Sequence, residues 1–163
     1  MNPFLKTIAS LLSIVLLASC YTYHVPRRCR KLQPPAEKQT VYIINPELQK
    51  EYEILRYAGF FNMTNDSTAA VKIKLNELGY HGVCGNGMII TMMSLGQLPS
   101  VLPGAYTLSY DEIRNGDTVN KALSFWLTQR VWFWDVFAFN KNFNKKAGKS
   151  LLGAYYGIYG KVF

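Results

Sequence analysis

The chain has 163 residues and a formal net charge of +8, and 49% of its residues are hydrophobic while 17% are charged. A chain of this length fits one domain, which excludes a large multidomain machine. The apolar and aromatic content excludes a chain that is disordered throughout, and the excess of Lys and Arg favours acidic partners such as anionic lipid, cell-wall carboxylates or nucleic acid.

The first residues have the three parts of an export signal. Lys6 lies in a short head, residues 8–18 are apolar apart from Ser10 and Ser13, and small residues precede Cys20. The apolar run of about eleven residues is shorter than the roughly 20 that span a bilayer as a helix, so a permanent N-terminal transmembrane helix is disfavoured. We predict a signal peptide over residues 1–19, removed on export.

The end of this signal, Leu17-Ala18-Ser19-Cys20, resembles the lipobox of bacterial lipoproteins at all four positions. The resemblance implies cleavage before Cys20 and acylation of that cysteine, and two or three acyl chains anchor a protein stably in a membrane. Tyr21 stands where an Asp would resemble an inner-membrane retention signal. The resemblance therefore favours the outer membrane, with the body facing the periplasm. An ordinary signal peptide with a nearby cysteine is the alternative.

Residues 20–38 are predicted to form a lipidated tether. Three prolines and little apolar periodicity favour an extended linker, which would reach up to about 55 Å. Its basic cluster has two interpretations: attraction to an anionic membrane surface, or simple solvation of the linker. The cluster comprises Arg27, Arg28, Arg30 and Lys31.

Two cysteines remain beside the predicted lipidation site. In an oxidising compartment a separated pair most simply forms a disulfide, so we predict a Cys29–Cys84 bond. The alternative is a metal site, because the two histidines of the chain precede these cysteines. That site would use His24, Cys29, His81 and Cys84.

In the body, residues 40–45 are β-branched and aromatic and predict a strand. Pro46 favours the start of a helix that continues at helical spacing to Gly59. The polar residues over 62–67 predict a turn, and the alternation over residues 70–78 predicts a half-buried strand.

Residues 88–98 are apolar and predict either a short helix, which we favour, or a buried strand, because periodicity does not separate the two in so short a run. The segment 94–100 is similar to a leucine-glycine-proline-serine stretch of small outer-membrane lipoproteins of unassigned role, a resemblance that implies no activity. Asn115-Gly116 lies between alternating runs over residues 106–113 and 118–127 and predicts a hairpin.

These elements predict an α+β fold with a small antiparallel or mixed sheet and one or two helices on one face, after the lipidated tether. We expect one domain over residues 39–140. A basic, Gly- and Tyr-rich C-terminal tail is expected over residues 141–163.

Aromatic and basic residues crowd the end of the chain. One interpretation is that the aromatics complete the core while the lysines are solvated, and the other is contact with a membrane or protein partner. The candidate contact residues are Trp126, Arg130, Trp132, Phe133, Trp134, Phe137, Lys141, Lys145, Lys146 and Lys149.

The sequence contains none of the common catalytic motifs, and we predict neither catalysis nor a cofactor. Export removes the chain from most nucleic acid, so nucleic acid is not an expected partner. The leading hypothesis is a lipid-anchored envelope protein that binds an unidentified protein, as an accessory or structural part of an outer-membrane, secretion or cell-wall assembly; anionic lipid and cell-wall material are further candidate partners. One alternative is a membrane-active lipoprotein whose aromatic and basic C-terminal segment inserts into a bilayer. The other is a periplasmic metal-binding protein.

Overall fold

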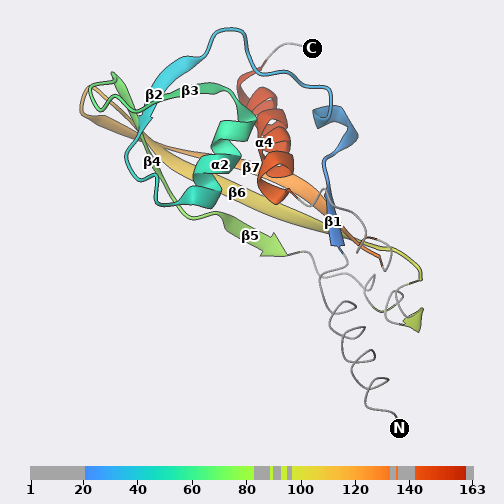
Figure 1. The fold of residues 1–163 in the computed structure, drawn as a ribbon. Helices are drawn as coiled ribbons and strands as arrows, with labels where there is room; N and C mark the ends of the chain where they lie inside the picture. The colour runs from blue at the N-terminus through green and yellow to red at the C-terminus, as the bar shows by residue number, and fades with distance from the viewer. Residues whose placement is uncertain are drawn as a thin grey trace, which may run out of the picture. The chain divides into compact units, whose positions relative to one another are not determined.

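The computed structural model describes residues 21–82, 89, 93–94, 97–132, 135 and 142–160, and these form an α+β fold (Figure 1). The predicted fold class is confirmed. The elements are β1 (Tyr21–His24), a 3-10 helix η1 (Arg27–Cys29), β2 (Gln39–Ile43), α2 (Gln49–Ala58), β3 (Phe61–Thr64), β4 (Val71–Leu75), β5 (Gly79–Gly82), β6 (Ser100–Arg114), β7 (Asp117–Val131) and α4 (Phe143–Tyr159).

The strands of the described residues form one mixed sheet in the order β1-β7-β6-β4-β2-β3, with β5 also paired to β6. β2 lies parallel to β3 and to β4, whereas β4 runs antiparallel to β6. α2 and α4 lie side by side over one face of the sheet (Figure 1). No helix among the described residues is long and apolar enough to cross a membrane.

The chain divides into two compact units. The larger unit, residues 24–83, 103–128 and 142–163, contains both α-helices and most of the sheet. The smaller unit combines residues 1–23, 84–102 and 129–141, and therefore includes most of β1 and one end of each of β6 and β7.

α2 forms because its apolar residues recur on one face. Ile54, Leu55 and Ala58 are buried at helical spacing, and Gly59 ends the helix in the left-handed conformation with φ 71°. Glu51 is also buried, and its Oε1 accepts a hydrogen bond from the Leu78 backbone N–H at 3.0 Å. The predicted helix and its glycine stop are confirmed, but the helix begins at Gln49 and not at Pro46, which lies in the turn before it.

Asn45 explains why β2 ends beside β4. Its side-chain amide donates to the Leu75 carbonyl at 2.8 Å, and its Oδ1 accepts from the Leu75 N–H at 2.7 Å. The side chain thus satisfies backbone groups at the end of β4 that a longer β2 would otherwise pair.

The predicted hairpin is confirmed, and its strands are longer than expected. Asn115 and Gly116 have φ values of 53° and 91°, the positive pair that a two-residue type I′ loop requires. β6 and β7 have fifteen residues each. Along them Leu108, Tyr110 and Phe125 alternate with exposed or half-exposed residues and pack beneath the helices.

α4 lies within the segment predicted as a tail, which is a correction to that prediction. Asn142 caps the helix by accepting the Lys145 N–H at 2.9 Å. Ala147, Leu151 and Leu152 are buried, so this segment belongs to the core of the larger unit. The apolar face of a helix is buried when the free energy gained by packing it against the core exceeds the free energy gained by leaving the segment in water.

The predicted tether is also much shorter than expected. Residues 21–24 form strand β1, Thr22 and Val25 are buried, and η1 buries Cys29. The prolines therefore direct a chain that lies against the body instead of an extended linker. In addition, β3 occupies part of the predicted turn, where Phe61 and Met63 pair in parallel register with Gln39 and Val41.

The ion pairs of Glu112 are expected to make the stability of the fold depend on pH. Burial alone would raise the pKa of this carboxyl, but hydrogen bonds and charges from Lys121 (2.6 Å) and Arg114 (3.0 Å) outweigh it and hold the pKa below the ordinary value of 4.5. A lowered pKa in the folded state means that the stabilisation is present above the unfolded pKa and is lost as the pH falls through the folded one. We expect Glu112→Gln to remove about 1 kcal/mol at neutral pH and nothing in strong acid.

Urea denaturation of the wild type and Glu112→Gln from neutral pH to about pH 3 measures this loss. Glu77→Gln is the control, because Glu77 is exposed. Equal differences between wild type and Glu112→Gln at both ends of the pH range would contradict the assignment.

Candidate functional site

The predicted aromatic and basic contact residues fall in different parts of the structure. Trp126 lies on β7 in the larger unit, and Arg130 and Trp132 lie in the smaller unit. The lysines Lys145, Lys146 and Lys149 lie on α4. The remaining four, Phe133, Trp134, Phe137 and Lys141, lie outside the described residues.

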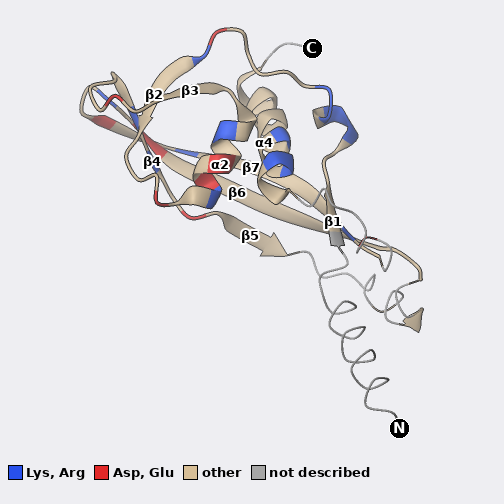
Figure 2. Cartoon of the chain, in the orientation of Figure 1, with Lys and Arg blue, Asp and Glu red and all other residues tan. Residues whose placement is uncertain are grey.

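The α4 lysines belong to a helix whose apolar face is already used. Lys145 and Lys149 are exposed and Lys146 is half-buried, and blue segments of the ribbon mark basic residues on α4 in Figure 2. Leu151 and Leu152 pack inside the larger unit, whereas Ile158 and Tyr159 at the end of α4 are 60% and 49% exposed. The buried leucines of α4 are therefore not available for contact with a bilayer as the helix is folded.

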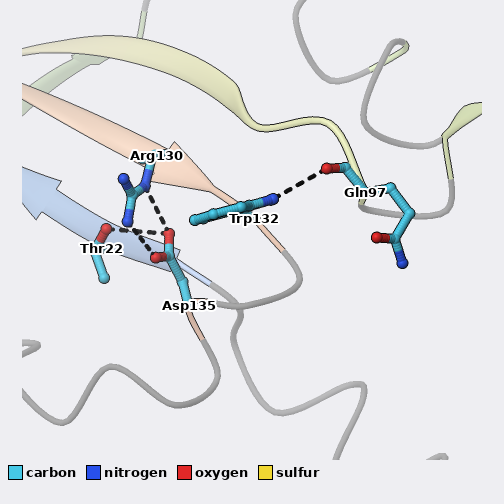
Figure 3. Close-up of polar contacts among 5 residues, drawn as sticks. All are labelled: Thr22, Gln97, Arg130, Trp132 and Asp135. Carbon is cyan, nitrogen blue, oxygen red and sulfur yellow. Dashed lines mark hydrogen bonds and ion pairs between the residues drawn. The ribbon is translucent and has the colours of Figure 1, made fainter.

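Arg130 is held by a buried carboxylate in the smaller unit (Figure 3). Its guanidinium contacts Asp135 twice, with Nε 3.1 Å from Oδ2 and a terminal nitrogen 2.5 Å from Oδ1. Thr22 Oγ1 donates to the same Oδ2 at 3.1 Å, and Asp135 is only 2% exposed. Hydrogen bonding to Asp135 raises the pKa of Arg130. Arg130 is therefore a structural cation that joins β1 to the end of β7 through Asp135.

Trp132 is likewise tied into this unit. Its indole N–H donates to the Gln97 carbonyl at 3.0 Å, and the Arg130 guanidinium carbon lies 5.1 Å from the centre of its ring (Figure 3). These contacts fix the segment around residue 97 to the segment that follows β7. Trp132 remains half-exposed.

The smaller unit exposes large apolar side chains that the sequence analysis did not single out. Met93 is 82% exposed, and three others are more than half exposed. The set is Ile89, Met93, Leu98 and Val101. Their apolar sequence predicted burial, so their exposure was not predictable from periodicity.

A cavity of about 660 Å³ lies within the larger unit, lined by η1, β7 and α4 together with the residues near them. Ser150 Oγ on α4 donates to the Trp126 carbonyl on β7 at 2.6 Å. Tyr156 Oη donates to the Gln33 carbonyl, just beyond η1, at 2.9 Å. These two hydrogen bonds hold α4 to the other walls of the cavity.

Cys29 lies at this cavity as a buried free thiol, so the predicted disulfide is not present in the structure. Its Sγ packs against Gly153 of α4 so closely that a Cβ at position 153 would overlap it. Burial raises the pKa of the Cys29 thiol, and Arg28 partly opposes this effect. Cys84, the predicted partner, lies outside the described residues.

The predicted metal ligands do not form a group where the structure describes them. His81 is exposed on β5 and Cys29 is buried, and Cys84 again lies outside the described residues. Within the described part of the chain, no three or more His, Cys, Asp or Glu residues are arranged to hold a metal ion.

No family model matches this sequence, and no curated protein matches it either. Among solved structures, the chain is similar to a minor lipoprotein from Acinetobacter baumannii, with 11% identity and a TM-score of 0.34 over 76% of this chain and 90% of that one. It is also similar to a dodecameric PelC variant from Paraburkholderia phytofirmans, with 11% identity and a TM-score of 0.32 over 87% of this chain and 99% of that one. Neither likeness assigns a family.

Proposed function

We propose that this chain is a lipid-anchored protein of the cell envelope that acts by binding. Acylated Cys20 holds it in the outer membrane, and the body faces the periplasm as an accessory or structural part of an envelope assembly. The partner is an envelope protein at the bilayer surface. Removal of residues 1–19 leaves a mature chain whose first residue carries the anchor.

The observation that carries the proposal is the position of β1. This strand begins at Tyr21, one residue after Cys20, and Thr22 is buried against Asp135. No long linker separates the anchor from folded structure, so the smaller unit is held beside the bilayer when Cys20 carries lipid.

The exposed apolar side chains of that unit supply the contact surface. Where exposed apolar residues adjoin one another on a folded unit, the patch they form is typical of protein or membrane interaction sites. Ile89, Met93, Leu98 and Val101 lie in the unit that begins at the anchor. An anchored chain meets partners in the plane of the membrane, where modest contacts suffice because the effective concentration is high.

Two measurements test this function. The intact mass of the chain purified from cells is expected to show loss of residues 1–19 and a gain of acyl mass, and Cys20→Ala is expected to abolish the acyl gain. Photo-crosslinking residues placed at positions 93 and 101 in intact cells are expected to capture an envelope protein.

Position 119 is the control for the crosslinking, because Val119 is 54% exposed, close to the 56% of Val101, and lies in the larger unit. An intact leader without acyl mass would overturn the anchor. Equal capture from positions 101 and 119 would overturn the contact surface.

A further inference from the structure

The cavity of the larger unit has the size of a small-molecule site. Ligand pockets typically have volumes of about 300–1,000 Å³ and mainly apolar walls with a few polar groups. This cavity, of about 660 Å³, lies within that range. Leu32 and Trp126 contribute apolar wall, and Trp126 is 51% exposed although it is a large apolar side chain. Phe125 also lines the cavity, but its ring is only 2% exposed and packs against Tyr106.

The α4 side of the cavity is kept open by small residues. The Cys29 side chain fills the space beside Gly153, whereas a Cβ added at Gly157 would meet nothing within 4 Å. Gly157 therefore leaves space that a larger side chain would fill. An elongated apolar group fits such a space better than a compact polar one, because the wall offers few hydrogen-bonding partners.

The charged residues described in the lining are all basic. Arg28 and Lys31 line the cavity and are exposed, and none of the described residues that line it is Asp or Glu. In the part of the chain that the structure describes, neither cation forms an ion pair with a carboxylate. Arg28 does interact with the Cys29 thiol, which its side chain hydrogen-bonds. An acidic group at this end of the cavity would therefore gain charge-assisted hydrogen bonds without displacing a carboxylate.

From this combination we infer that the cavity binds an amphiphile with one acyl chain and an acidic headgroup, either a carboxylate or a phosphate. The acyl chain lies along Leu32, Trp126 and the glycine face of α4. The headgroup binds Arg28 and Lys31. This inference is independent of acylation at Cys20, since the cavity is built from residues of the larger unit.

The test uses the full chain as purified from cells, held in phosphatidylcholine nanodiscs. Three photoreactive probes share one saturated chain with a diazirine near its methyl end: a fatty acid, the matching phosphate monoester and the matching alcohol. Peptide mapping is expected to place the label on β7 and α4 at the cavity. Both acidic probes are expected to label about tenfold more than the alcohol.

Two variants separate the chain from the headgroup. Gly157→Leu fills the open space and is expected to reduce labelling by all probes about tenfold or more, with no loss of thermal stability, because leucine favours a helix more than glycine does. Arg28→Gln with Lys31→Gln is expected to remove the advantage of the acidic probes. Lys145→Gln with Lys149→Gln removes the same charge from exposed positions that do not line the cavity, and is expected to change nothing.

The labelling results test whether the site exists and show which kind of acidic amphiphile it binds. Preferential labelling by the phosphate supports the site and identifies a phospholipid-derived ligand, whereas preferential labelling by the carboxylate supports it and identifies a free fatty acid. Wild-type labelling of Gly157→Leu, or label confined to other segments, would overturn the site. Equal labelling by the alcohol would overturn the acidic headgroup.

Discussion

Gly148→Ala is expected to lower the free energy of unfolding by about 1–3 kcal/mol, although alanine favours a helix more than glycine does. Gly148 is buried where α4 crosses α2. A Cβ at this position would lie 2.6 Å from the Cβ of Tyr57 and 2.8 Å from both the Ala58 backbone nitrogen and the Ile54 carbonyl oxygen. Because two of these atoms are backbone, the helices must move apart to admit one methyl group.

Gly157→Ala is the matched control in the same helix. A Cβ there meets nothing, so the substitution is expected to stabilise the chain by up to about 1 kcal/mol through helix propensity. Urea denaturation followed by circular dichroism measures both changes. Equal changes in stability for the two variants would show that the helices do not approach each other at Gly148.

The regular elements that the sequence predicted are those in which local pattern and tertiary burial agree. β2, α2, β4 and the hairpin each have a periodic apolar face, and Gly59 and Asn115-Gly116 supply the required positive φ. When local preference and global packing point the same way, sequence alone identifies the element.

The missed elements depend on packing that the sequence does not display. α4 contains three glycines, Gly148, Gly153 and Gly157, which lower its intrinsic helix propensity. The structure needs the first two because α2 and Cys29 approach the helix there. β3 was missed for a similar reason: it is a short strand at the edge of the sheet, and turn-forming residues follow it directly.

The cavity was even less accessible from sequence. Its cations were noted as a basic cluster, and Trp126 was named as a contact residue, but Cys29, Trp126 and Gly157 are far apart along the chain. The hydrogen bonds from Ser150 and Tyr156, together with the packing of Cys29 against Gly153, bring η1, β7 and α4 together around it. Sequence predicted residue types suited to binding, whereas their convergence follows from tertiary structure.

Asp135→Asn is expected to free β1 from the end of β7, with a local cost of about 2–3 kcal/mol. Breaking a buried ion pair typically costs about 3–5 kcal/mol because it leaves a charge without a partner. We expect the lower cost of about 2–3 kcal/mol because one third of the Arg130 side chain is exposed, so water partly solvates the charge that loses its partner. The asparagine amide would turn a donor toward either Arg130 or Thr22, so it cannot replace both contacts.

Hydrogen exchange measures this effect where it is expected. Amides of residues 21–24 and 129–131 should exchange about 30-fold to 150-fold faster in Asp135→Asn, whereas those of α2 should keep their protection. Asp111→Asn is the control, since Asp111 bonds Asn120 at 2.6 Å on an exposed part of the hairpin and belongs to the larger unit. Unchanged exchange at residues 21–24 in Asp135→Asn would mean that other contacts hold β1. The proposal that the anchor sits directly on folded structure would then have to rest on those contacts instead of on Asp135.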